Sequence, residues 1–95
     1  MNPARGEAWL VNRMLRPSFA ALVAAEEELG PLFALVERSA SGQLKLSEMA
    51  TLFWHCLSDR NDLTRESFGE LVAKAGLVAV TPALKTLIGQ ILAGR

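Results

Sequence analysis

Residues that end and begin helices recur along this chain at intervals of roughly ten to twenty positions. Apolar stretches close at Gly30, Gly42 and Gly76, and Pro31 and Thr64 open new ones. Glycine takes the left-handed conformation that ends a helix, whereas proline and hydroxyl residues suit its first positions. Joints this closely spaced leave room only for short helices. We therefore predict a mainly α-helical domain of about five short helices.

Apolar residues recur every three or four positions between these joints, as they do on the buried face of a helix. Leu and Ala dominate the composition and favour helix, whereas β-branched Val and Ile are few. A chain of 95 residues forms one domain, so we assign residues 1–95 to a single helical domain. The last helix is predicted to begin at Thr81 and Pro82. The predicted core stripes are Phe19, Leu22 and Val23; Leu32, Leu35 and Val36; Met49, Leu52, Phe53, Cys56 and Leu57; Phe68, Leu71, Val72 and Ala75; and Leu84, Leu87, Ile88, Ile91 and Leu92.

Residues 7–16 are the one stretch with strand-like content. Asn12 and Arg13 are placed as a tight turn between two short apolar segments, since Asn tolerates positive φ. We predict a short N-terminal β-hairpin there. A two-stranded hairpin is marginal in water, so this one must pack against the rest of the domain.

The charge balance and the apolar content narrow the classes of partner. Ten Lys and Arg balance ten Asp and Glu, so the formal net charge is zero. This argues against binding nucleic acid through phosphate neutralisation and is compatible with self-association into a homo-oligomer. No apolar run approaches the ~18 residues of a membrane span, and the first residues lack the apolar core of a signal peptide. A lone cysteine fits a reducing cytosol, so we expect a cytoplasmic protein without membrane contact.

The inventory of reactive residues argues against an enzyme. His55 and Cys56 are the single histidine and the single cysteine, and no further ligands lie at a spacing that supports a metal site. The same inventory argues against a Cys/His nucleophilic site. No phosphate-binding glycine loop, nucleophile elbow or paired-carboxylate signature is present. We therefore expect no catalytic residue, no metal and no cofactor.

The segment 37–48 follows the spacing of a calcium-binding EF-hand loop. Only two carboxylates remain at the ligand positions, which weakens calcium binding. The alternative is a plain connection between two helices, with glycine at the cap. The positions that match are Glu37, Ser39, Ser41, Gly42, Leu44 and Glu48.

Two features indicate contacts with a partner protein. Glu26, Glu27 and Glu28 form an acidic run near the end of the first helix, where Glu26 falls inside the apolar stripe. Glu26 either reaches solvent at the core edge or pairs with an arginine such as Arg16 or Arg38, in preference to a partner; Glu27 and Glu28 are expected to be solvated. Trp54 lies off the buried face of the third helix and is equally compatible with an interface anchor and with a position under a loop or the hairpin.

The last helix also bears on partner contacts. It is rich in large apolar residues and either closes the core or offers a groove to a partner helix.

The order of segments resembles the small tail-assembly proteins of gene transfer agents and related tailed phages, a family labelled either tail tube protein or tail assembly chaperone. The resemblance covers nearly the whole chain and consists of caps, breakers and apolar stripes. The segments that carry it are Arg5-Gly6-Glu7, Arg16-Pro17-Ser18-Phe19-x-Ala21-Leu22, Glu26-x-x-Leu29-Gly30, Gly42-x-Leu44, and Glu70-Leu71 leading to Ala75-Gly76-Leu77.

The resemblance implies a non-enzymatic tail assembly chaperone of a phage or gene transfer agent. Such a protein binds the tape-measure protein in the cytoplasm of the bacterial host, keeps its apolar helices from aggregating, and helps tail tube subunits assemble around it. The alternatives are a structural tail subunit retained in the particle and, less favoured, a degenerate EF-hand-like calcium-binding module.

Overall fold

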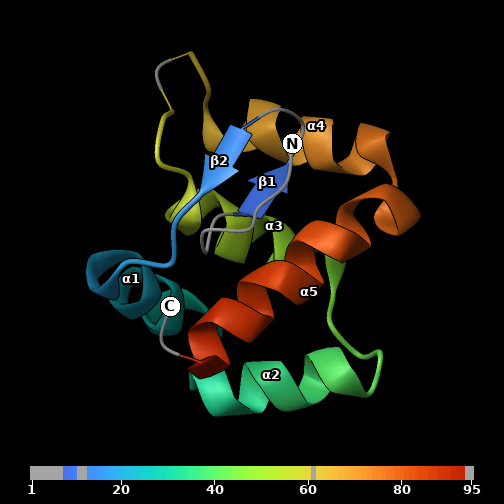
Figure 1. Ribbon diagram of the computed structural model, residues 1–95. Helices are drawn as coiled ribbons and strands as arrows, with labels where there is room; N and C mark the ends of the chain where they lie inside the picture. Colours follow the sequence, from blue (N-terminus) through green and yellow to red (C-terminus); the bar gives the residue numbers. More distant parts are fainter. Residues whose placement is uncertain (1–7, 11–12, 61, 94–95) are drawn as a thin grey trace.

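Five helices and a short hairpin enclose one apolar core in the computed structural model, which describes residues 8–10, 13–60 and 62–93 (Figure 1). The mainly helical fold predicted from the sequence is confirmed. The elements are β1 (Ala8–Leu10), β2 (Arg13–Leu15), α1 (Phe19–Leu29), α2 (Leu32–Ala40), α3 (Leu46–Cys56), α4 (Arg65–Ala75) and α5 (Leu77–Ala93).

The ends of α1 and α4 form where the caps predict them. The Ser18 hydroxyl oxygen accepts a hydrogen bond from the N–H of Ala21 at the start of α1, and Thr64 accepts one from Ser67 at the start of α4. Gly30 and Gly76 take positive φ values of 87° and 91° after α1 and α4. A side chain with a Cβ adopts that conformation only under strain, so glycine is the residue that these two joints require.

The hairpin forms within the predicted segment, but one of the two predicted turn residues, Arg13, lies in a strand. β1 pairs antiparallel with β2, with Leu10 opposite Arg13. Arg13 therefore belongs to strand β2 and not to the turn, and its guanidinium lies 3.2 Å from a carboxylate oxygen of Asp62. Residues 11–12, which include the predicted turn residue Asn12, lie outside the described residues.

The hairpin is anchored to the end of α3, as its marginal stability requires. The N–H of Arg16 donates to the carbonyl of Cys56 at 2.6 Å, and the N–H of Ser58 donates to the carbonyl of Met14 at 3.1 Å. Leu15 is fully buried and forms a β-bridge with Leu57. Backbone pairing and a core side chain together hold β2 in place.

The core is built mainly from the stripes of α3, α4 and α5 predicted from the sequence. Helix α3 packs against both α1 and α4, and α5 packs against α4 and β1 (Figure 1). The largest fully buried side chains are Phe53, Phe68, Leu15, Leu35, Leu52, Leu87, Val72, Val80 and Cys56.

Helix α1 turns a different face to the core from the one predicted. Ala21 and Ala25 are buried, whereas Phe19 is 84% exposed and Val23 is also exposed. The helix is thus rotated by about a third of a turn relative to the predicted stripe. Small alanine side chains let the backbone of α1 approach α3 closely, and this contact is favoured over burial of the larger side chains.

Helix α5 begins at Leu77 and not at the predicted Thr81 and Pro82, so Pro82 lies inside the helix. Burial explains the extra turn, because Val80 is fully buried in the core. Proline lacks the N–H that would bond to the carbonyl four residues earlier. That carbonyl belongs to Val78, a residue that is 88% exposed. The Thr81 hydroxyl donates to the carbonyl of Leu77 at 2.6 Å in the same turn.

Within the described residues, no single helix is long and apolar enough to cross a membrane. Helices α4 and α5 meet that criterion only as a pair, bent by 112° at Gly76.

Candidate functional site

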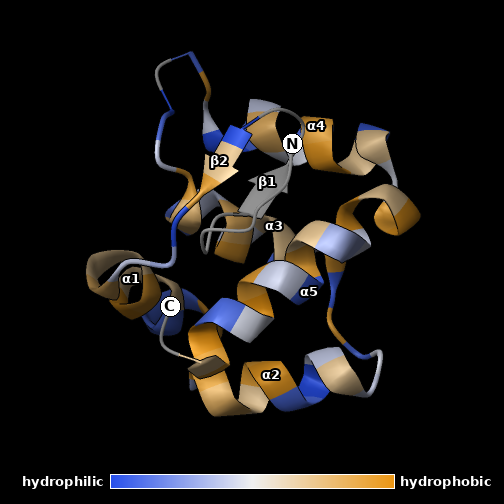
Figure 2. Ribbon diagram, viewed as in Figure 1, coloured by the Kyte–Doolittle hydropathy of each residue, from blue (hydrophilic) through white to orange (hydrophobic). Residues whose placement is uncertain are grey.

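Exposed apolar side chains gather where α1, α2 and the end of α5 meet. A groove of about 370 Å³ opens between these helices. Phe19 and Val23 are exposed and lie next to the groove residue Leu22 on α1, at helical spacing. Figure 2 shows hydrophobic colour on α2 and on the adjoining end of α5. We call this surface the α1–α2–α5 face. It comprises Phe19, Val23 and the groove lining, which is Leu22, Glu26, Pro31, Leu32, Phe33, Val36, Ile91 and Leu92.

Two aromatic side chains of this face are largely exposed to solvent. Phe33 is 79% exposed and Phe19 is 84% exposed, and Leu92 adds a third large exposed side chain. Single exposed apolar residues are normal, but a contiguous apolar patch marks a binding surface. The face is therefore the strongest candidate for a site of protein contact.

Glu26 fixes the corner between α1 and α2 from the edge of the groove. Its Oε2 accepts a hydrogen bond of 3.1 Å from the N–H of Leu32, the first residue of α2. A carboxylate at a helix N-terminus is favoured by the helix dipole. The sequence suggested Arg16 or Arg38 as a partner for Glu26, but Arg38 instead pairs with Glu48. Glu26 remains exposed and leaves a negative charge at the rim.

Glu28 is exposed, as expected, but it is also ion-paired and joins α1 to two other helices. Its two carboxylate oxygens accept hydrogen bonds from Nη1 and Nη2 of the Arg65 guanidinium at 2.8 Å each. The Nε2 atom of His55 lies 3.1 Å from Oε2 of the same carboxylate. The hydrogen bond from Arg65 is the main cause that lowers the pKa of Glu28 to about 2, against the opposing effect of burial. This cluster of charged side chains connects α1 to α3 and α4. Glu27, between the two, is exposed.

Trp54 is half-buried and covered by the loop that follows α3. Its ring centroid lies 6.0 Å from that of Phe68, and the guanidinium carbon of Arg60 lies 4.6 Å from the Trp54 ring centroid. This geometry matches one of the two alternatives that the sequence offered for Trp54, a position under a loop. A role for Trp54 in partner binding stays a prediction.

The segment 37–48 forms the plain helix–helix connection that was the alternative to a calcium loop. Gly42 takes a φ of 76° just after α2. Glu48, which would supply the bidentate ligand, accepts a hydrogen bond from the N–H of Lys45 at 2.9 Å and pairs with Arg38. These contacts hold the pKa of Glu48 below its usual range, and they use its two oxygens within the fold. Among residues 13–60 and 62–93, no three or more His, Cys, Asp or Glu side chains cluster to hold a metal ion.

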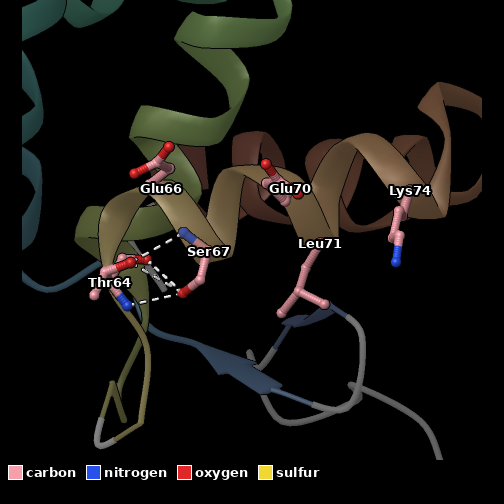
Figure 3. A pocket seen from close by; sticks show the side chains of 6 residues that line it. All are labelled: Thr64, Glu66, Ser67, Glu70, Leu71 and Lys74. Atoms are coloured by element: carbon pink, nitrogen blue, oxygen red, sulfur yellow. Dashed lines mark hydrogen bonds between the residues drawn. The ribbon is translucent and has the colours of Figure 1, made fainter.

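A second hollow, of about 410 Å³, lies along α4 and is open and polar (Figure 3). The hydroxyl groups of Thr64 and Ser67 already cap the helix through hydrogen bonds to each other and to the backbone. In Figure 3, Glu66 and Glu70 point to one side of α4 and Leu71 and Lys74 point to the other. The side chains do not converge on one point, so this hollow is a weak candidate for a ligand site.

Cys56, singled out in the sequence as the one thiol, is buried in the core. Burial raises the pKa of its thiol to about 12, and the positive charge of Arg60 opposes this only in part. The thiol is therefore protonated at neutral pH, and the reactive thiolate is scarce.

Phe33 is the residue of the face that sequence reasoning missed, although a signal was present. It lies about 100° from Leu32 and off the stripe that α2 turns to the core. The same off-stripe position singled out Trp54 on α3. Phe19, Val23 and Leu92 gave no such signal, because each falls on a stripe that periodicity assigns to the core.

A protein-family model matches most of the chain. Residues 11–94 match the family described as "Phage tail tube protein, GTA-gp10". No curated protein and no solved structure matches the chain.

Proposed function

The chain belongs to this family of phage and gene-transfer-agent tail proteins, and on that premise we propose that it is a tail assembly chaperone. In this proposal it binds the tape-measure protein in the cytoplasm of the bacterial host, without catalysis, and hands it to tail tube subunits during assembly.

One observation carries the proposal: the α1–α2–α5 face leaves two phenylalanines almost fully exposed beside an apolar groove. Burying an apolar side chain of this size is worth about 1.5–3 kcal/mol. A protein that masks the apolar helices of a client needs such a surface open while it is unbound. The face therefore suits transient cover of an aggregation-prone partner.

The experiment is co-expression with the tape-measure protein of the same phage or gene transfer agent. The proposal predicts that the tape-measure protein becomes soluble and co-purifies with the tagged chain. A tape-measure protein that stays insoluble while this chain elutes alone would overturn the proposal.

The family description favours a second candidate, a structural subunit retained in the tail. The two functions differ in where the protein ends up. Mass spectrometry of purified particles would find a structural subunit in repeated copies along the tail. A chaperone leaves before the particle matures, so its peptides should be missing from the same sample.

A further inference from the structure

We propose that the α1–α2–α5 face receives a single amphipathic helix of the tape-measure protein, with the apolar side of that helix in the groove and a Lys or Arg flank against Glu26 and Glu27. This inference rests on the proposed function and adds to it the binding surface and the chemistry of the segment that is bound.

The shape of the face favours a helix as the occupant. The groove runs between helices and is lined by aliphatic side chains, chiefly Leu22, Val36 and Ile91, with Phe33 at its edge. An amphipathic helix presents apolar anchors at positions i, i+3, i+4 and i+7, which fill such a groove in succession. Phe19 continues the apolar surface along α1 beyond the groove.

The charge of the face favours a basic flank on that helix. Of the described groove-lining residues, Glu26 carries the sole formal charge, and exposed Glu27 follows it on α1. The last turn of α1 contains no basic residue, so the negative end of its dipole adds to the charge of Glu27, whereas the N-terminus of α2 offsets part of the charge of Glu26.

The nearby arginines do not cancel this charge. Arg38 on α2 is paired with Glu48, and Arg65 on α4 is paired with Glu28. Their positive charges are therefore offset by carboxylates other than Glu26 and Glu27. Within the described part of the chain, the rim of the face is left acidic, which complements Lys or Arg on the bound helix.

The same charge argues against a second copy of this chain as the occupant. A two-fold dimer pairs a surface with itself. Two copies joined through this face would bring two acidic rims into one interface, and like charges there oppose association. A basic amphipathic helix meets the apolar and the electrostatic requirement together.

The test compares two matched substitutions of highly exposed apolar residues in complexes with the co-expressed tape-measure protein. Phe33→Asp alters the face, whereas Val78→Asp alters the distant turn at the start of α5. We expect Phe33→Asp to weaken binding at least about 10-fold, as the loss of an interface anchor does, and Val78→Asp to change it by less than about 2-fold. Both variants should keep the circular dichroism spectrum of the unaltered chain, since neither side chain is buried.

A charge variant tests the second half of the proposal. Glu27→Lys should weaken binding at low salt, and the difference from the unaltered chain should shrink as salt is raised, because salt screens exposed charges. Glu70→Lys, at an exposed site on α4, is the control and should bind as the unaltered chain does. Equal binding by Glu27→Lys at all salt concentrations would overturn the basic flank.

The outcomes separate this inference from the function on which it rests. If the unaltered chain fails to bind the tape-measure protein, the proposed function fails. If the unaltered chain and Phe33→Asp bind equally, the proposed function stands, but the α1–α2–α5 face is not the binding surface. If the free chain sediments as a dimer that Phe33→Asp dissociates, the face belongs to a second copy and the inference is overturned.

Discussion

Replacement of Glu28 by Gln should destabilise the fold, because this one carboxylate ties together three helices. Glu28 on α1 receives a bidentate hydrogen bond from Arg65 on α4 and lies within hydrogen-bond distance of His55 on α3. Arg65 also donates to the hydroxyl oxygen of Thr51 at 3.2 Å. Gln keeps the size but removes the charge and replaces one acceptor oxygen with an NH2 donor, so the substitution breaks the bidentate ion pair.

The exposure of the pair limits the expected magnitude. The Glu28 and Arg65 side chains are 39% and 48% exposed, so water screens their attraction. Exposed pairs contribute about 0.2–1 kcal/mol, and bidentate geometry places this pair near the upper end. In a domain of this size 1 kcal/mol corresponds to a change in melting temperature of about 4–8 °C. We expect Glu28→Gln to melt lower by a few degrees, about 3–6 °C.

The effect also has a predictable dependence on pH. Folding lowers the pKa of Glu28 from 4.5 to about 2, so the folded state favours the ionised form. The stabilisation is therefore fully present above pH 4.5 and is lost as the pH falls through the folded-state value near 2. The free-energy difference between the two proteins should shrink as the pH falls below 4.5.

Urea unfolding of Glu28→Gln, Arg65→Gln and the double variant provides the assay, because the cycle isolates the pairwise energy. We expect a coupling of about 0.5–1 kcal/mol at pH 7 and low salt. A coupling indistinguishable from zero under those conditions would refute the reasoning. So would a Glu28→Gln difference that is equally large at pH 7 and at pH 2.5.

Three further predictions concern the core, the thiol and the interior proline. Phe53→Ala should lower the free energy of unfolding by about 3–5 kcal/mol, because Phe53 is fully buried; chemical denaturation measures this, and a loss below about 1 kcal/mol contradicts the packing. Cys56 should react with a thiol reagent such as DTNB only after denaturant is added, given its burial and raised pKa; rapid reaction of the native protein at pH 8 would show that the thiol is accessible. Pro82→Ala should stabilise α5 by about 1 kcal/mol, since it supplies a missing N–H at an exposed position; a lower melting temperature would mean that the helix begins at Pro82, as the sequence predicts.

The sequence predicts the helix joints well because their causes are local. Ser18, Gly30, Thr64 and Gly76 act through their own hydroxyl groups or backbone conformations, within a few residues. The start of α5 is different. Thr81 and Pro82 form a good local start signal, but burial of Val80 extends the helix by a turn. A tertiary contact therefore sets the start of α5, and a local sequence pattern does not predict it.

The face that α1 turns to the core is also decided by tertiary contact. The helix carries two apolar stripes, one of small residues through Ala21 and Ala25 and one of large residues through Phe19 and Val23. Periodicity ranks the large stripe first, whereas close packing against α3 selects the small one. The large stripe then stays at the surface and becomes part of the candidate site. Phe19 and Val23 were missed as surface residues for the same reason that the predicted orientation of the helix was wrong.

The most direct test of the account is a map of the residues that meet the bound partner. An NMR titration of the isotopically labelled chain with a synthetic peptide, covering an amphipathic helical segment of the tape-measure protein, gives this map. The account predicts that the largest chemical-shift changes fall on the groove and on the outer stripe of α1, at Leu22, Val23, Phe33, Val36 and Leu92. Changes centred on α4 or on the first turn of α5, with the α1–α2–α5 face unaffected, would contradict it.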